Sequence, residues 1–476
     1  MSNQNNTLRV GMIFISMIYF IFGFVTTFII TLSDPVMEAF DLTYTQGFLV
    51  NSAFFISYAV FSIPSGSVVK RIGYKNSIFL GLILMSFAGF LFFPAIRTES
   101  YPFFLGAILL LSLGVVILQT SCNPFVTKLG PPETASGRLN LTMALNSIAT
   151  WLAPLMIVGL ILPAAVPQIG AAVDGLASEV IPEAIRPGDL LPPFLIIGGV
   201  ILLVAIGIRF IKLPVLSQEG LGNYATVFKY RHVLLGALGI FCYVGAEVGI
   251  GTAISSYVVQ PGLGGGVSRE LALKFVGLYW AGAMIGRLFA AIALSDVKNK
   301  KMKLIFAGAI VIWAFIVGFV TLEYSLPMSL TFLGFVVLNY FLMMIGRGKA
   351  NLVLSVFAVV AIILAITSML STGRVALWAI VSIGLFNSVM FPNIYSLAVK
   401  GLDRSEVSLA TGVINTFIVG GAVIPIFMGM VGDALNIQYS FIVPVICYLY
   451  ILFFALVGSK LPPAGETAAP GPAASE

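Results

Sequence analysis

Residues 233–258 read VLLGALGIFCYVGAEVGIGTAISSYV, and Glu247 is the only charged side chain in this run. A helix needs about 20 apolar residues to cross the hydrocarbon core of a bilayer, so this run is long enough to span it. The whole chain is 59% hydrophobic and 9% charged, whereas soluble domains carry roughly 25% charged residues. The sequence therefore predicts an integral membrane protein with many spans.

Runs of similar length recur on both sides of this stretch. Six of them precede a basic stretch from Lys212 to Arg231, and eight follow it, which predicts fourteen spans. The predicted spans lie near 11–32, 48–68, 76–96, 102–122, 139–163, 192–212, 233–258, 271–294, 303–323, 327–346, 351–370, 376–398, 407–431 and 438–458.

The positions of the basic residues support this arrangement, because cytoplasmic loops of membrane proteins are enriched in Lys and Arg. If the N-terminus is cytoplasmic, only five of the 25 basic residues fall on the outer side: Arg97, Arg186, Arg269, Lys274 and Arg374. The net charge of +6 is spread over many short loops. It therefore reflects membrane topology, and no nucleic-acid partner is expected.

The two halves of the chain share polar residues at matching places. An amide lies five residues before a proline in Gln119–Pro124 and again in Asn387–Pro392. Asn146 precedes Pro154 in the next span, as Asn415 precedes Pro425 in the second half. Two such pairs in the same order indicate duplicated halves, which are common in secondary transporters.

Longer motifs resemble a known family. The segment 118–154, LQTSCNPFVTKLGPPETASGRLNLTMALNSIATWLAP, is similar to the fucose and glucose/galactose permeases of the major facilitator superfamily. YVGAEVGIG at 243–251 and GLFNSVMFPNIYSLAVKGL at 384–402 resemble its glucose/galactose branch. The loop GSVVKRIGYK at 66–75 is similar to the superfamily's inner-loop signature, with Lys70 where an acid is usual.

The resemblance implies an all-α fold with two pseudo-symmetric six-helix bundles. Because the family has twelve spans, we interpret the two runs within about 303–346 as an inserted transmembrane hairpin, the alternative being that 327–346 lies along the membrane surface. The expected domains are an N-terminal bundle at 1–212, a cytoplasmic linker at 213–231, a C-terminal bundle at 232–460 and a disordered cytoplasmic tail at 461–476.

Two acidic residues are candidates for proton coupling. Glu247 lies deep in its predicted span, where a charge is costly and needs a reason, and Tyr243 lies one helical turn before it. The pair predicts a sugar-binding or proton-carrying site, although a purely structural carboxylate would fit as well. Asp34 matches an acid that the resemblance assigns to proton coupling; the alternative is an ordinary interfacial acid, since Glu38 and Asp41 follow closely.

Amide side chains are the other candidates for contacts to substrate, because they both donate and accept hydrogen bonds, as sugar hydroxyls do. Gln119 and Asn123 share one helix face, and Gln119 stands where fucose symporters carry a second acid. Asn146 matches a binding-site amide of the family. Each amide could instead join helices to one another. With Tyr243 and Glu247, the predicted sugar contacts are Gln119, Asn123, Asn146, Asn387 and Asn415.

Two arginines near the predicted inner surface, Arg138 and Arg287, are candidate gating residues. The resemblance implies an inner gate in which they engage carboxylates or helix ends. The alternative is that each is an interfacial anchor whose charged end reaches the lipid headgroups.

We therefore expect a secondary transporter that imports a hexose-type sugar by alternating access with proton symport. Sodium-coupled transport of a sugar or an N-acetylhexosamine, drug/proton export, a membrane sensor and an intramembrane enzyme are the alternatives. The expected setting is a bacterial inner membrane, with both termini cytoplasmic and the chain a monomer. We expect no catalytic residues, cofactor or metal, and the expected partners are a sugar, a coupling ion and the lipid bilayer.

Overall fold

The computed structural model describes residues 2–128, 135–161, 185–211, 226–293, 299–346, 349–402 and 404–460. All regular elements in these ranges are helical. Most of the predicted linker at 213–231 and the whole predicted tail at 461–476 lie outside the described residues, so the expected domain boundaries stay predictions.

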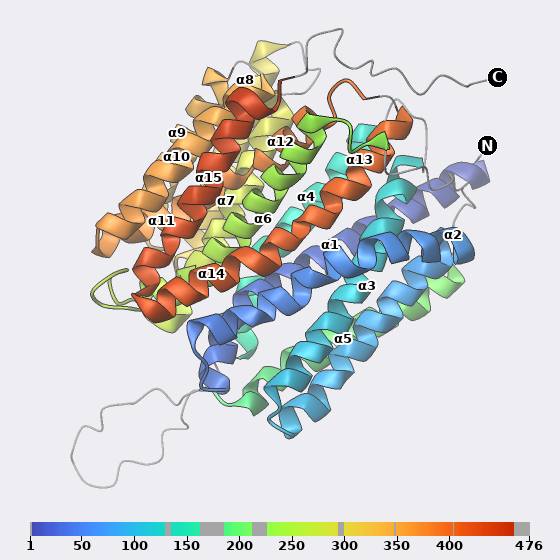
Figure 1. The fold of residues 1–476 in the computed structure, drawn as a ribbon, viewed down its shortest axis with the longest axis horizontal. Coiled ribbons are helices and arrows are strands. Elements are labelled where there is room, and N and C mark those ends of the chain that lie inside the picture. Colours follow the sequence, from blue (N-terminus) through green and yellow to red (C-terminus); the bar gives the residue numbers. More distant parts are fainter. Residues whose placement is uncertain are drawn as a thin grey trace, which may run out of the picture.

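Figure 1 shows how the helices follow one another along the chain. The first half contains α1 (Ser2–Ala39), α2 (Tyr44–Arg97), α3 (Tyr101–Lys128), α4 (Ala135–Leu160) and α5 (Leu191–Phe210). The second half contains α6 (Arg231–Val258), α7 (Arg269–Ala293), α8 (Lys300–Thr321), α9 (Leu326–Ile345), α10 (Ala350–Leu370), α11 (Gly373–Asn387), α12 (Met390–Ala398), α13 (Arg404–Thr416), α14 (Gly420–Ala434) and α15 (Ile442–Phe453).

Within the described residues, twelve helical segments are long and apolar enough to cross a membrane. The prediction of fourteen spans was therefore wrong as a count, and the difference arises at two places. The predicted spans 48–68 and 76–96 form one 54-residue helix, α2, whose two arms meet at a kink. The predicted span 139–163 lies in the 26-residue helix α4, and its continuously described part, Leu145–Leu160, is apolar but shorter than a span.

The kink in α2 lies at Gly73, within the loop motif that the sequence placed between two spans. Gly73 has φ 80° and ψ 163°, which are not helical values. A residue with a Cβ rarely adopts a positive φ, whereas glycine does so at little cost. The turn that the sequence predicts between the spans 48–68 and 76–96 is thus made by the single residue Gly73.

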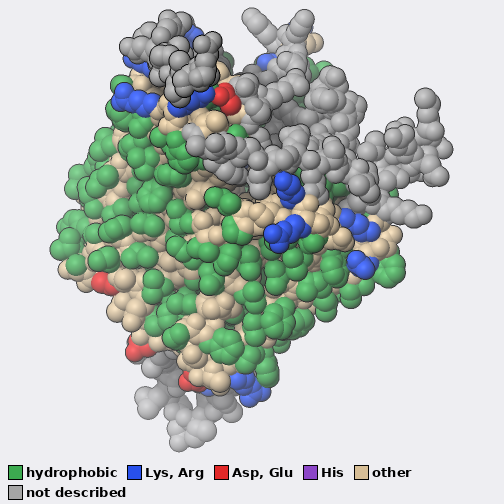
Figure 2. Space-filling model, turned by 45° about the vertical axis from the view of Figure 1, so that its right-hand side comes forward, with side chains coloured by type: hydrophobic (Ala, Val, Ile, Leu, Met, Phe, Trp, Pro, Cys, Tyr) green, Lys and Arg blue, Asp and Glu red, His purple; other side chains and the backbone are tan. Residues whose placement is uncertain are grey.

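Hydrophobic side chains cover most of the described surface on the face shown in Figure 2. Large apolar residues such as Ile13, Leu203 and Phe210 are exposed by 71%, 71% and 82%. Soluble proteins do not leave so much apolar surface in contact with water. The surface therefore agrees with the composition, and the chain is a multi-pass membrane protein.

The packing of helices repeats between the halves. In the first half α1 packs on α4 and α2 packs on α5; in the second half α6 packs on α14 and α10 packs on α15. In this correspondence α4, which carries Asn146, matches α13 and α14, and Asn415 lies near the end of α13. The internal repeat inferred from the amides is therefore visible in the contacts.

The predicted inserted hairpin corresponds to α8 and α9, which pack on each other and on α7. α9 also contacts α10 and α11. Figure 1 shows α8 and α9 at the outer edge of the second half, away from α3 and α5. Since α7 and α10 correspond to the two arms of α2, the hairpin lies where the first half has only the kink at Gly73.

One end of the molecule is closed by contacts between the halves. Asp433, at the end of α14, accepts hydrogen bonds from the backbone N–H groups of Tyr44 and Thr45, at 2.8 and 2.9 Å, and from the Thr45 hydroxyl. The first N–H groups of a helix have no partner within it. Asp433 therefore caps α2 from the other half of the chain; we call this end the closed end.

Gly429, one turn before Asp433, permits this approach. A Cβ built on Gly429 would lie 2.8 Å from the Cα of Thr45, closer than real atoms approach. The first turn of α2 and the last turn of α14 therefore contact each other through their backbones.

We expect Gly429→Ala to separate the helices at the closed end, because the added methyl group overlaps the backbone of α2. Spin labels on Glu99→Cys and Arg374→Cys, two exposed positions in a background without the native cysteines, would report longer distances in double electron–electron resonance. Asp433→Ala should act in the same direction by removing the cap.

The matched control is Gly334→Ala in α9, where the added methyl group meets no atom within 4 Å. This variant should leave the distance distribution unchanged. An unchanged distribution in Gly429→Ala would contradict the proposed role of the backbone contact.

Candidate functional site

Glu247 lies in the middle of α6 and is 9% exposed. Tyr243, one turn earlier, donates a hydrogen bond of 2.6 Å to Glu247 Oε1. The guanidinium of Arg287 on α7 places Nη2 3.7 Å from the same oxygen. The carboxylate is thus held between a hydroxyl and a positive charge, which is how a buried acid is compensated in a membrane.

A chain of hydrogen bonds connects this acid to two further helices. The Tyr279 hydroxyl of α7 donates to the Glu247 backbone carbonyl at 2.9 Å, and Asn387 Nδ2 donates to that hydroxyl at 2.9 Å. Tyr448 of α15 then donates to Asn387 Oδ1 at 2.8 Å. All four side chains are buried. Every member of this chain has a partner, so α6, α7, α11 and α15 are fixed relative to one another around Glu247.

Local backbone features place Asn387 in this chain. α11 ends at Asn387, and α12 begins at Met390, so the amide lies at a break between two helices. A Cβ on Gly384 would lie 2.1 Å from the Tyr279 carbonyl oxygen, so glycine allows α11 to contact α7 closely. Broken helices of this kind frequently mark substrate sites in transporters.

Arg287 also reaches the first half of the chain. Its Nε donates to the Ser388 carbonyl at 3.3 Å, and its Nη1 lies 3.3 Å from Ser147 Oγ on α4. The guanidinium therefore contacts an acid, a broken helix and the opposite half at once. The expectation that Arg287 engages a carboxylate agrees with this geometry, while a gating role stays a prediction.

Two predicted amides of the first half converge on Tyr19, in α1. Asn146 Nδ2 donates to the Tyr19 carbonyl at 2.9 Å, and the Tyr19 hydroxyl donates to Asn123 Oδ1. Gln119, one turn before Asn123, is half-buried on α3 beside Tyr58 of α2. The amides are thus joined to tyrosines, as the amide of Asn387 is. Asn146 and Ser147 are neighbours, so the two clusters meet at α4.

Asp34 lies in a different network, toward the closed end. The Ser256 hydroxyl donates to Asp34 Oδ1 at 2.7 Å, and Arg269 Nε is 3.9 Å from Oδ2. Arg269 also pairs with Glu38. Because Ser256 and Glu247 are nine residues apart on α6, roughly 13 Å of helix separates the two acids. The structure does not bring them together.

The other candidates lie elsewhere. Asn415 is half-buried on α13, and the described contacts do not link it to Glu247. The side chain of Arg138 lies outside the described residues. Among the described residues, no three His, Cys, Asp or Glu side chains are grouped closely enough to hold a metal ion.

Sequence reasoning missed Tyr19, Tyr279, Tyr448 and Ser147. All four lie in apolar runs, where a tyrosine or a serine is an ordinary residue of a helix interior. Tyr279 lies two helical turns before Arg287, which was the only available signal that it shares a face with that arginine.

The model of the Major Facilitator Superfamily matches residues 15–346 of the chain. This chain belongs to the Major Facilitator Superfamily. The resemblance to fucose and glucose/galactose permeases is also confirmed. A glucose/galactose transporter of Brucella abortus is 36% identical over 450 residues, covering 94% of this chain and 93% of the relative. The L-fucose-proton symporter of Escherichia coli is 28% identical over 438 residues, covering 89% and 87%.

A solved structure of a superfamily transporter, FucP in the outward conformation, is also similar. It is 26% identical, the match covers 95% of this chain and all of that chain, and the TM-score is 0.61. In terms of the superfamily fold, the Glu247 cluster lies where α6, α7, α11 and α15 of the second half face α4 of the first. The superfamily's binding sites lie between repeats near the middle of the membrane.

Replacing Asn387 with alanine should lower the free energy of unfolding by about 1–3 kcal/mol, because the buried hydroxyls of Tyr279 and Tyr448 each lose a partner. The loss is measured as a lower midpoint of thermal unfolding in detergent.

Asn415→Ala is the matched control, because this amide is half-buried and lies outside the tyrosine network. Equal loss of stability in the two variants would show that the network around Asn387 does not stabilise the fold.

Proposed function

We propose that this chain is a secondary active transporter that imports a hexose-type sugar by alternating access and proton symport. The observation that carries the proposal is the buried Glu247–Arg287 pair, which adjoins a broken helix and contacts the opposite half through Ser147. The names of the relatives support a sugar as substrate, of the glucose/galactose or fucose type.

The pair offers a physical link between a proton and the conformation. A proton on Glu247 removes the negative charge that faces Arg287, and a charged hydrogen bond is about twice as strong as a neutral one. The guanidinium is then held mainly by the Ser388 carbonyl and the Ser147 hydroxyl. Protonation would thus change how strongly α7 binds α6 and α4, the helices that must separate or approach in alternating access.

The proposed sugar contacts are Gln119, Asn123, Asn146, Tyr243, Glu247, Asn387 and Asn415. In the present conformation Asn123 and Asn146 bind Tyr19, and Asn387 binds two tyrosines. Sugar hydroxyls would replace these partners one for one, since amides and hydroxyls both donate and accept. This exchange would release α1 from α3 and α4 when the sugar enters.

Asp34 is the second proposed coupling residue. Its hydrogen bond to Ser256 joins α1 to α6 at the closed end. Protonation of Asp34 would weaken its attraction to Arg269 and so favour opening of this end. From the distribution of basic residues, we propose that the closed end faces outward from a bacterial inner membrane and that both termini are cytoplasmic.

Glu247→Gln should abolish the stimulation of sugar uptake by an inward proton gradient, because the amide keeps the shape of the side chain but binds no proton. Uptake of labelled glucose, galactose and fucose into proteoliposomes, with and without an imposed pH gradient, measures this. Counterflow, which needs no net coupling, should persist at a lower rate.

Asp34→Asn should weaken the same stimulation, and Glu99→Gln is the control at an exposed position. Uptake driven by sodium but indifferent to pH would contradict proton coupling and favour the sodium-coupled alternative, for which N-acetylhexosamines belong in the panel. Absence of counterflow for every sugar would contradict sugar transport itself.

A further inference from the structure

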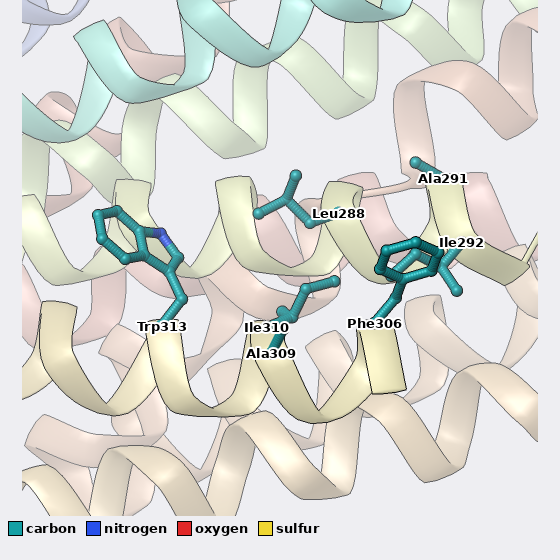
Figure 3. A pocket seen from close by; sticks show the side chains of 7 residues that line it. All are labelled: Leu288, Ala291, Ile292, Phe306, Ala309, Ile310 and Trp313. Atoms are coloured by element: carbon teal, nitrogen blue, oxygen red, sulfur yellow. The ribbon is translucent and has the colours of Figure 1, made fainter. Parts of the chain in front are cut away.

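The inserted hairpin forms an apolar groove with the transporter core. The groove lies between α7 and α8 and has a volume of about 450 Å³. Leu288 and Ile292 line it from α7, and Phe306, Ile310 and Trp313 line it from α8. Figure 3 shows the α8 side chains directed toward the side chains of α7. The lining is apolar except for the indole N–H of Trp313, so the groove suits a hydrocarbon chain far better than a sugar.

The groove is accessible from the surface of the protein. Phe306 is 44% exposed and Trp313 is 40% exposed, although both line the groove. The neighbouring Ile312 is 64% exposed and belongs to the apolar outer surface of α8. From Phe306 to Trp313 the groove follows two turns of α8, or roughly 10 Å. An acyl chain of the surrounding bilayer can therefore enter from the side.

A cluster of positive charge lies at one end of this groove. The sequence KNKKMK at 298–303 ends one turn before Phe306. Of the described side chains, Lys301 is exposed and Lys303 is half-buried. Lysines at the edge of the hydrocarbon region attract anionic lipid headgroups. The apolar groove and the lysines are thus arranged like the two parts of a phospholipid, an acyl chain and a charged headgroup.

We propose that the groove between α7 and α8 binds an anionic phospholipid, with one acyl chain between Ile292 and Trp313 and the headgroup beside Lys301 and Lys303. The occupant is a lipid of the surrounding membrane, selected by the charge of its headgroup.

The groove is also connected to the helices that carry the candidate site. Trp151 of α4 donates a hydrogen bond of 3.2 Å to Thr321 Oγ1 at the end of α8, and its ring lies 6.5 Å from that of Trp313. Leu288, in the groove, follows Arg287 directly. A bound lipid would therefore contact the junction of α4, α7 and α8. Its binding does not depend on the proposed sugar transport.

Trp313 gives a direct measurement of occupancy. In a variant with Trp151→Phe, Trp280→Phe and Trp378→Phe, it is the single tryptophan. The protein is reconstituted in vesicles of phosphatidylcholine. Increasing fractions of one brominated lipid are added, either brominated phosphatidylglycerol or brominated phosphatidylcholine. Each lysine near the surface favours an anionic lipid about fivefold. Brominated phosphatidylglycerol should therefore quench Trp313 at a membrane fraction at least about fivefold lower than brominated phosphatidylcholine needs.

The combined change Lys301→Gln and Lys303→Gln should remove this preference, whereas Lys70→Gln with Lys460→Gln, two exposed lysines elsewhere, should leave it intact. If the triple tryptophan variant does not elute as a single species, Trp313→Phe in the native background replaces it and should lose the selective part of the quenching. Equal quenching by both brominated lipids, or a preference that survives the change of Lys301 and Lys303, would overturn the proposal.

Discussion

The hydrocarbon interior of a bilayer has no hydrogen-bonding partners to offer, and the structure depends on how Glu247 meets that constraint. Its carboxylate accepts a hydrogen bond from Tyr243 and faces the guanidinium of Arg287. Its backbone carbonyl accepts a hydrogen bond from the Tyr279 hydroxyl. An uncompensated charge in this position would be expelled or protonated. The partners come from α6 and α7, and through Asn387 and Tyr448 from α11 and α15. Four helices of the second half are thus ordered around one acid.

The same constraint applies to the polar groups through which the two halves contact each other. Asn51 of α2 bridges Ser33 of α1 and Thr252 of α6, at 3.1 and 2.8 Å. Asp433 caps α2, and Arg287 reaches Ser147. Ser256 also donates to Asp34, Ser52 donates to the Ala422 carbonyl, and Trp151 donates to Thr321. Motion between the halves therefore requires these polar groups to exchange partners.

Much of the fold could be predicted from sequence, because hydrophobic runs and basic loops are local signals. The family resemblance, the repeat and the position of the added hairpin all followed from residues that could be quoted. The span count differed because hydropathy does not reveal that Gly73 turns the chain within one residue, so that α2 runs through as one helix. For the site, Glu247, Tyr243 and Asn387 were named as candidates, the first two by their spacing on one helix and Asn387 by the repeated amide. Their partners Tyr279 and Tyr448 were not, since a tyrosine in an apolar run gives no sign of which helix its hydroxyl meets. The separate network of Asp34 also required the structure, because its partner Ser256 lies on another helix.

The cap that Asp433 places on α2 exists only while the two halves touch. When they part, the backbone N–H groups of Tyr44 and Thr45 lose their acceptor and face water. The rate at which these two amides exchange hydrogen for deuterium is therefore a built-in gauge of how often this end opens. It needs no label and no knowledge of the transported solute, so a peptide that contains the start of α2 could be used to screen unknown compounds for those that shift the resting state.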